Sequence, residues 1–192
     1  MRPYRRNKKP QQGNYAFIDS QNLNLGTQKM GWKMDWRKFR QFLKDKYGVT
    51  HAYMFIGYMA ENEQLYEYMH DLGFLVVLKP TLDVKVTPEV ETETKEAAKG
   101  SEEQKHQVKG NIDADLVLHA MKELPNYNKA IIVSGDGDFY GLIEYLKEKN
   151  KLLNIMAPNW QYSSLLKAFE PYIIRLDQLK RELAYYDHRK KT

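Results

Sequence analysis

Cysteine is absent from the 192-residue chain, and its histidines are few and scattered. Without cysteine there is no disulfide scaffold, no thiol nucleophile and no thiolate zinc site. The five histidines show none of the HxH, HxxxH or HExxH spacings that bind zinc, so we interpret each as structural or solvated. Zinc chemistry and thiol catalysis are therefore disfavoured.

Long apolar runs are also missing. The longest, residues 74–78, is far too short to cross a bilayer, and the first residues do not resemble a signal peptide. The sequence contains neither a Gly-x-x-x-x-Gly-Lys-Ser/Thr phosphate loop nor a Gly-x-Gly-x-x-Gly fingerprint. We therefore expect a cytoplasmic protein with no membrane partner, and the commonest nucleotide-binding enzymes are disfavoured.

The positive charge of the chain is concentrated at its two ends. The formal net charge is +5, but five cations lie within residues 1–12 and three within residues 189–191, which leaves a mildly acidic body. A basic arm attracts nucleic-acid phosphates without sequence preference, although it is equally typical of a solubilising tail. The predicted RNA contacts in this arm are Arg2, Arg5, Arg6, Lys8 and Lys9.

Apolar runs alternate with helical periodicities along the chain. The predicted strands cover residues 14–19, 50–58, 74–79, 129–134, 152–157 and 172–176. The predicted helices cover residues 35–46, 61–71, 112–124, 138–149, 161–169 and 178–188. This alternation predicts an α/β fold: a three-layer α/β/α sandwich with a mostly parallel, Rossmann-like central sheet. We expect one domain over residues 13–177, preceded by a flexible basic arm (1–12) and followed by a helix and basic tail (178–192).

The most informative motif is Ser-Gly-Asp-Gly-Asp-Phe, residues 134–139, which follows an apolar run and opens a helix. Parallel strands place ligands and chemistry at their carboxyl ends. The glycines permit a tight turn, Asp138 is a candidate helix N-cap, and Asp136 and Asp138 are expected in one small space. Two carboxylates so near to each other favour binding of a hard divalent cation such as Mg2+ or Mn2+ between them. An Asp-Gly turn alone is also a common helix cap.

Two further segments carry acids in comparable positions. Asp19 ends the first predicted strand, and Asn22 lies one helical turn beyond it. Asp113 begins a helix and lies on its apolar stripe, whereas Asp115 is rotated away and is expected to face solvent or merely to favour the helix N-terminus. An ionised acid on a buried face needs a partner, which a metal or Lys109 could provide.

Together these motifs resemble an NYN domain of the LabA-like group over about residues 14 to 176. The resemblance implies a PIN-like nuclease fold and a metal-dependent ribonuclease, in the first instance an endonuclease, that binds Mg2+ or Mn2+. Its implied catalytic and metal-binding residues are Asp19, Asp113, Asp136 and Asp138, with Asn22, Ser134 and Lys109 in support. Several carboxylates suit this chemistry because bound metal both generates hydroxide and neutralises charge on the phosphate.

Residues 81–109 interrupt the alternation with half a hairpin and a stretch rich in Glu, Lys, Thr and Gln. We interpret this segment as a mobile loop, with Lys79 and Lys85 as candidate RNA contacts. Trp32 and Trp160 are expected to be exposed. Residues 32–40 mix cations with aromatics, but the helical spacing of Trp36 and Phe39 favours core packing over base stacking.

Three functions remain open from the sequence. The first is the metal-dependent RNase. The second is a non-catalytic module with the same fold that binds RNA or a protein. The third is another Mg2+-dependent phosphoesterase, because carboxylates at strand ends recur across unrelated chemistries. Pairing of two copies through the C-terminal helix would give a homodimer.

Overall fold

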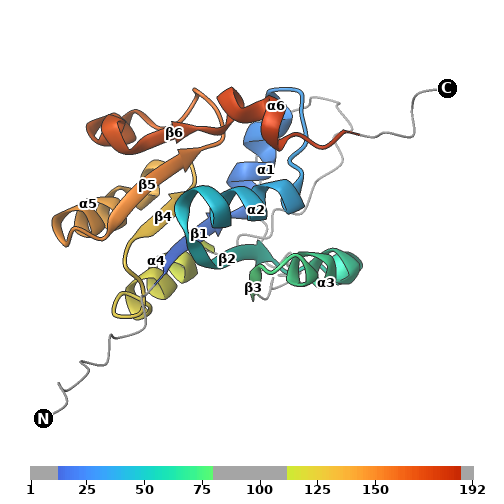
Figure 1. The fold of residues 1–192 in the computed structure, drawn as a ribbon, viewed down its shortest axis with the longest axis horizontal. Coiled ribbons are helices and arrows are strands. Elements are labelled where there is room, and N and C mark those ends of the chain that lie inside the picture. Colours follow the sequence, from blue (N-terminus) through green and yellow to red (C-terminus); the bar gives the residue numbers. More distant parts are fainter. Residues whose placement is uncertain (1–12, 80–111, 187–192) are drawn as a thin grey trace, which may run out of the picture.

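The computed structural model describes residues 13–79 and 112–186 and is built around one six-stranded sheet (Figure 1). The predicted basic arm, the predicted loop 81–109 with Lys85 and Lys109, and the basic tail 187–192 lie outside the described residues. Within the described parts of the chain, no helix has both the length and the apolar character needed to cross a membrane.

All five strand pairings are parallel, and the strand order is β3-β2-β1-β4-β5-β6. The strands are β1 (Asn14–Asp19), β2 (Val49–Gly57), β3 (Leu75–Lys79), β4 (Ala130–Val133), β5 (Leu152–Ala157) and β6 (Ile173–Arg175). The central strands β1 and β4 are almost entirely buried, as expected for a parallel sheet covered on both faces. The predicted α/β fold is confirmed, and the sheet is wholly rather than mostly parallel.

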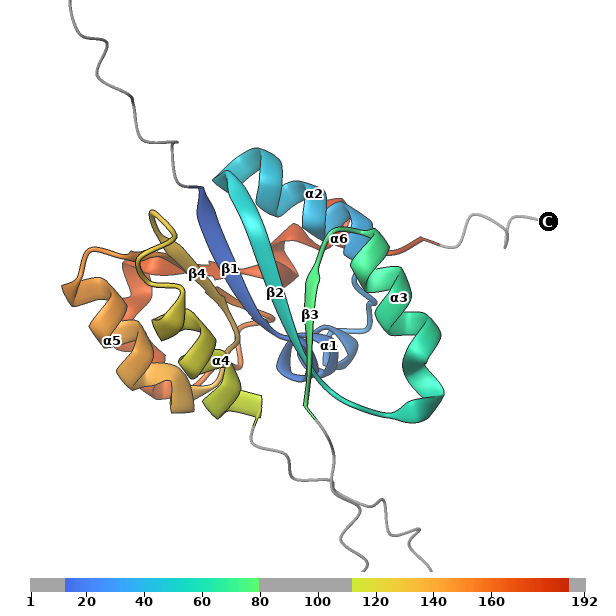
Figure 2. The ribbon, with the colours of Figure 1, turned by 90° about the horizontal axis from the view of Figure 1, so that it is seen from below.

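Helices cover both faces of the sheet (Figure 2). The α-helices are α1 (Ser20–Lys29), α2 (Trp36–Tyr47), α3 (Glu63–Asp71), α4 (Ile112–Lys122), α5 (Tyr140–Glu148) and α6 (Lys180–Leu183). Short 3-10 helices are η1 (Ala60–Asn62), η2 (Gly137–Phe139), η3 (Ser164–Tyr172) and η4 (Leu176–Leu179).

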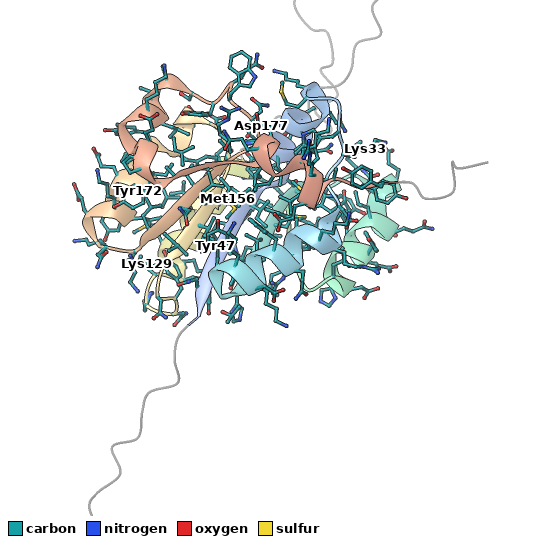
Figure 3. All side chains as sticks on the ribbon, turned by 45° about the horizontal axis from the view of Figure 1, so that its top comes forward. Lys33, Tyr47, Lys129, Met156, Tyr172 and Asp177 are labelled. Carbon is teal, nitrogen blue, oxygen red and sulfur yellow. The ribbon has the colours of Figure 1, made fainter. Side chains whose placement is uncertain are left out.

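Each face of the sheet has its own apolar core. Side chains of α1, α2, α3 and α6 pack on one face, in a cluster that includes Phe39, Leu43 and Met156. Met156 and Tyr47, which packs against this cluster, are labelled in Figure 3. Side chains of α4, α5 and η3 pack on the other face with Phe17. The predicted three layers follow directly from these two clusters.

Helix α2 shows why the aromatic and basic residues 32–40 are structural. Its N-cap Asp35 accepts from the backbone of Arg37 and Lys38, and Gly48 ends it in the left-handed conformation at φ 62°. Arg40 donates to the carbonyl oxygens of Gly73, Val49 and Thr50. Trp32 is only 6% exposed, so its predicted exposure is wrong, whereas Trp160 is 58% exposed as predicted. In this helix Phe39 is therefore part of the core, and the Arg40 side chain binds backbone carbonyls of the neighbouring segments.

The structure differs from the predicted helices at three places. Helix α1 was not predicted, because its sequence buries only Leu23 and Thr27 and contains Gly26, so its periodicity is weak. The predicted helix 161–169 is instead the kinked 3-10 helix η3. The predicted helix 178–188 is shorter and ends at Leu183.

The C-terminal helix stops because the chain turns back to pair with the segment before α2. Ala184 is extended, at φ −71° and ψ 143°, and forms an antiparallel bridge with Met34. The Asp35 amide donates to Leu183, and the Tyr185 amide donates to Lys33. Backbone partners outside the helix therefore replace the next helical turn.

Two helical glycines provide a matched test of packing. A Cβ at Gly26 of α1 would lie 2.4 Å from Cβ of Pro158, whereas a Cβ at Gly141 of α5 meets nothing within 4 Å. We predict that Gly26→Ala lowers the free energy of unfolding by about 1–3 kcal/mol through overpacking. Gly141→Ala should raise it by about 0.5–1 kcal/mol, because alanine is the better helix former. Urea denaturation of both variants measures the difference, and equal effects would contradict the close approach of α1 to Pro158.

Candidate functional site

The strand order creates a topological switch point between β1 and β4. The chain runs outward through β2 and β3 on one side of β1, then returns to β4 on the other side and continues outward to β6. Ile18 is paired with Val133, so the residues that follow each strand emerge side by side. In open parallel sheets such a point forms a crevice that binds ligands.

Asp19, the last residue of β1, lies at this switch point and is 6% exposed. One carboxylate oxygen accepts the backbone amide of Asn22 at 3.0 Å, which caps α1. The other accepts the hydroxyl of Ser134 at 3.2 Å. Two hydrogen bonds and the end of a strand therefore hold the carboxylate in a fixed position.

Ser134 and Asn22 connect the exits of the two strands. The Ser134 hydroxyl, which donates to Asp19, also accepts the Asp136 amide at 3.1 Å. The side-chain oxygen of Asn22 accepts the Gly135 amide at 2.9 Å. Asn22 thus contacts both strand exits, through its backbone amide at Asp19 and through its side-chain oxygen at Gly135.

Asp136 and Asp138 lie on the turn into η2. Asp136 is half-buried and caps this 3-10 helix by accepting the Asp138 amide at 3.0 Å. Asp138 is exposed and lies inside the helical turn. The prediction that Asp138 is the N-cap is therefore wrong, because the helical turn begins at Gly137 and Asp136 caps it.

The start of α4 brings two more acids to the same edge. Asp113 is half-buried in its first turn. Asp115 forms a salt bridge with Lys79 at the end of β3, 3.1 Å from nitrogen to oxygen, and its side chain remains 34% exposed. The sequence prediction did not include this partner. Figure 2 shows that α4 begins close to the end of β3. Lys79, predicted as an RNA contact, therefore lies beside the acids.

Electrostatic coupling joins four of these carboxylates. Burial raises the pKa of Asp19, and Asp113 and Asp136 raise it further, although hydrogen bonds from Asn22 and Ser134 oppose them. Burial also raises the pKa of Asp113, as do Asp136 and Asp138, while Lys79 lowers it. The four predicted acids therefore lie within one electrostatic field at one sheet edge.

The carboxylates share a field without forming a closed coordination sphere. Among residues 13–79 and 112–186, no three acid or histidine side chains converge closely enough to hold a metal ion. The residues still fit a hard divalent cation in chemistry, since their donors are oxygens and the buried Asp19 is destabilised by its anionic neighbours.

A cleft of about 350 Å3 adjoins the acids. Asn22 and Gly135 form the edge that it shares with the acidic site, and the far wall comes from the segment after β5. Its other lining residues are Leu25, Gly26, Gln28, Lys29, Pro158, Asn159, Gln161 and Tyr162. The motif search missed this cleft. The available signal was Pro158 and Asn159 directly after a third parallel strand, at the edge where ligands bind.

A family model described as "NYN domain" matches residues 15–177, nearly all of the described sheet and its helices. The chain belongs to the NYN domain family. This family has a PIN-like fold and is assigned to the ribonucleases, which agrees with the parallel sheet and the acids at its carboxyl edge. The resemblance stated from the three motifs is thereby confirmed.

Two known proteins are similar to this NYN domain protein over most of their length. The low amplitude and bright protein LabA of Synechococcus elongatus is 24% identical over 169 residues, which cover 85% of this chain and 83% of that protein. A crystal structure of a protein of unknown function from Vibrio parahaemolyticus is 20% identical, with a TM-score of 0.64, and the match covers 92% of this chain and 99% of that one. The second likeness supports the fold alone.

The raised pKa values predict how stability depends on pH. Folding raises the pKa values of Asp19 and Asp113 above the ordinary value of 3.8, so the folded protein binds these protons more tightly than the unfolded chain does. The resulting stabilisation is fully present below pH 3.8 and is lost as pH rises through the raised pKa values. We predict that Asp19→Asn gains stability relative to the wild type as pH rises from below 3.8 to neutral.

The measurement is urea denaturation in EDTA across this pH range. Asp45→Asn, at an exposed position on α2, is the control and should show a flat difference from the wild type. A flat difference for Asp19→Asn would contradict the burial penalty at this carboxyl.

Proposed function

We propose that this protein is a metal-dependent ribonuclease that hydrolyses RNA phosphodiester bonds at the edge between β1 and β4. The observation that carries the proposal is the buried Asp19 carboxylate, hydrogen-bonded to Ser134 and coupled to Asp113 and Asp136 at the switch point. Family membership supports the same reaction class. The acids that support the proposal come from three separate parts of the chain: the end of β1, the turn after β4 and the start of α4.

Mg2+ or Mn2+, when bound, would supply hydroxide at neutral pH and neutralise charge on the reacting phosphate. Asp19, Asp113, Asp136 and Asp138 would hold it. Asp19 is the fixed ligand, since the Asn22 amide and the Ser134 hydroxyl hold both of its oxygens. Asp138 is the adjustable one, because its side chain is exposed, while Asp136 is held through one oxygen by its cap of η2.

Residues around the acids would position the RNA. Asn22 uses its side-chain oxygen for Gly135, which leaves its amide nitrogen directed to a different partner such as a phosphate oxygen. Lys79 lowers the pKa of Asp113 and thus places positive charge near the phosphate path. Arg2, Arg5, Arg6, Lys8, Lys9, Lys85 and Lys109 remain predicted RNA contacts or supports outside the described residues.

A second candidate is a binding module that holds RNA without cutting it. The observation in its favour is that no three acids in the described parts of the chain converge on one point. Catalysis requires that metal or substrate draw the other carboxylates towards Asp19, whereas binding requires no such movement. RNA binding without turnover in any divalent metal would support this alternative.

We predict that single-stranded RNA is cleaved in Mn2+ or Mg2+ and that EDTA abolishes cleavage. Asp136→Asn should lower the rate by at least about a hundredfold, because it removes a negative oxygen ligand. Asp45→Asn is the matched control, since it removes one carboxylate from an exposed position on α2 and should leave the rate unchanged. Gel analysis of end-labelled RNA measures the rates and reveals whether internal bonds are cut.

Metal binding has its own readout in the melting temperature. Mn2+ should raise the melting temperature of the wild type and of Asp45→Asn, and raise that of Asp136→Asn much less. Cleavage that persists in EDTA and in Asp136→Asn would refute the metal mechanism. Hydrolysis of a small phosphate ester with RNA left intact would instead identify a phosphoesterase.

A further inference from the structure

We propose that the cleft beside the acids is a subsite for one unpaired nucleotide of the RNA, adjacent to the bond that is cut. This inference rests on the proposed function and extends it to the substrate: RNA that is single-stranded at the cleavage site. The cleft occupies about 350 Å3, within the range of about 300–1,000 Å3 that small-molecule sites span.

Continuity with the acids is the first argument. Asn22 and Gly135 line the cleft and are joined by a hydrogen bond, and the backbone amide of Asn22 also donates to the Asp19 carboxylate. A chain whose phosphate lies at Asp19 and Asp136 therefore has its next residue at the mouth of the cleft. Asn22 therefore contacts both compartments, the cleft through its side chain and Asp19 through its backbone amide.

The chemistry of the lining is the second argument. Among the described residues that form the cleft there is no carboxylate, and Lys29 is the single cation. Gln28 and Gln161 offer amide donors and acceptors, which suit the edge of a base. Tyr162 adds an aromatic ring to the wall, and base stacking on such rings is tolerant of sequence. This lining contrasts with the anionic site beside it.

Rigidity of the cleft is the third argument. Asn159 is 5% exposed and ties the two walls together. Its side-chain nitrogen donates to the backbone carbonyl of Gly26 in α1 at 2.8 Å, and its side-chain oxygen accepts the backbone amide of Gln161 at 2.7 Å. The Ser163 amide further fixes the loop by donating to Gly135 at 2.9 Å. The walls are therefore positioned before any ligand binds, which lowers the entropic cost of binding.

An unpaired nucleotide fits this cleft better than a duplex. The amides lie between α1 and the loop after β5, so a base must enter with its hydrogen-bonding edge free, whereas in a duplex that edge is paired. The exposed Trp160 lies on the same loop, between the lining residues Asn159 and Gln161. Its fluorescence provides a local signal for binding.

The test is binding of a short single-stranded RNA in EDTA, followed by tryptophan fluorescence, so that its result does not depend on cleavage. Tyr162→Ala should weaken binding about tenfold through loss of stacking, and Tyr162→Phe should restore the affinity of the wild type. Gln161→Glu should weaken binding about fivefold by placing an anion in the cleft. Gln41→Glu is the matched control on α2 and should change affinity little.

A modified RNA separates stacking from general charge attraction. Removing one base at a time should reveal one position at which loss of the base weakens wild-type binding about tenfold. That penalty should disappear in Tyr162→Ala, because the ring it requires is absent. The corresponding RNA duplex should bind at least about tenfold more weakly than the single strand.

The proposal is overturned if the RNA does not bind, if all base deletions have equal effects, or if Gln161→Glu and Gln41→Glu weaken binding equally. Melting temperatures of each variant identify loss of folding, and Tyr162→Phe keeps the test valid if Tyr162→Ala is unstable. Cleavage in Mn2+ with unchanged binding in the cleft variants would reject the subsite alone. Selective binding without cleavage would reject the nuclease while keeping the subsite.

Discussion

The parallel pairing of β1 with β4 is the constraint on which the rest of the site depends. Because Ile18 is opposite Val133, the next residues of each strand, Asp19 and Ser134, meet across the sheet and share a hydrogen bond. Strand register thus brings together two residues that are separated by 115 positions in the chain. The cap of α1 and the turn after β4 both extend from this pair.

Burial makes the arrangement electrostatically costly, and that cost is informative. Asp19 could be satisfied as a helix cap alone, since Asp is a favoured cap at exposed positions. Its burial and the neighbouring Asp113 and Asp136 add a penalty that capping does not require. Clustered, perturbed carboxylates are characteristic of functional sites, and here they lie where parallel sheets bind ligands.

Much of the fold could be predicted from the sequence because strong periodicities are local. The buried runs that became β1 and β4 and the amphipathic pattern of α2 were recognised, and the βα alternation then predicted the sheet. Helix α1 was missed because packing and the Asp19 cap stabilise it, rather than its own apolar stripe. The end of α6 was misplaced because the competing backbone partners, Lys33 and Asp35, are far away in the chain.

The acids of the candidate site were predicted one by one. The salt bridge between Lys79 and Asp115 and the cleft lined by Gln28 and Tyr162 could not be predicted, because they arise only from tertiary contacts.

The salt bridge between Lys79 and Asp115 has a consequence for how this chain tolerates changes in length. It joins the end of β3 to the start of α4 and so holds these two ends of the described chain beside each other. Because closing a chain between fixed ends costs only about 0.6 kcal/mol for each doubling of its length, insertions and deletions there leave the sheet in register. The sheet and the acids of the described residues therefore tolerate changes of length between Lys79 and Ile112 as long as these two ends stay in place.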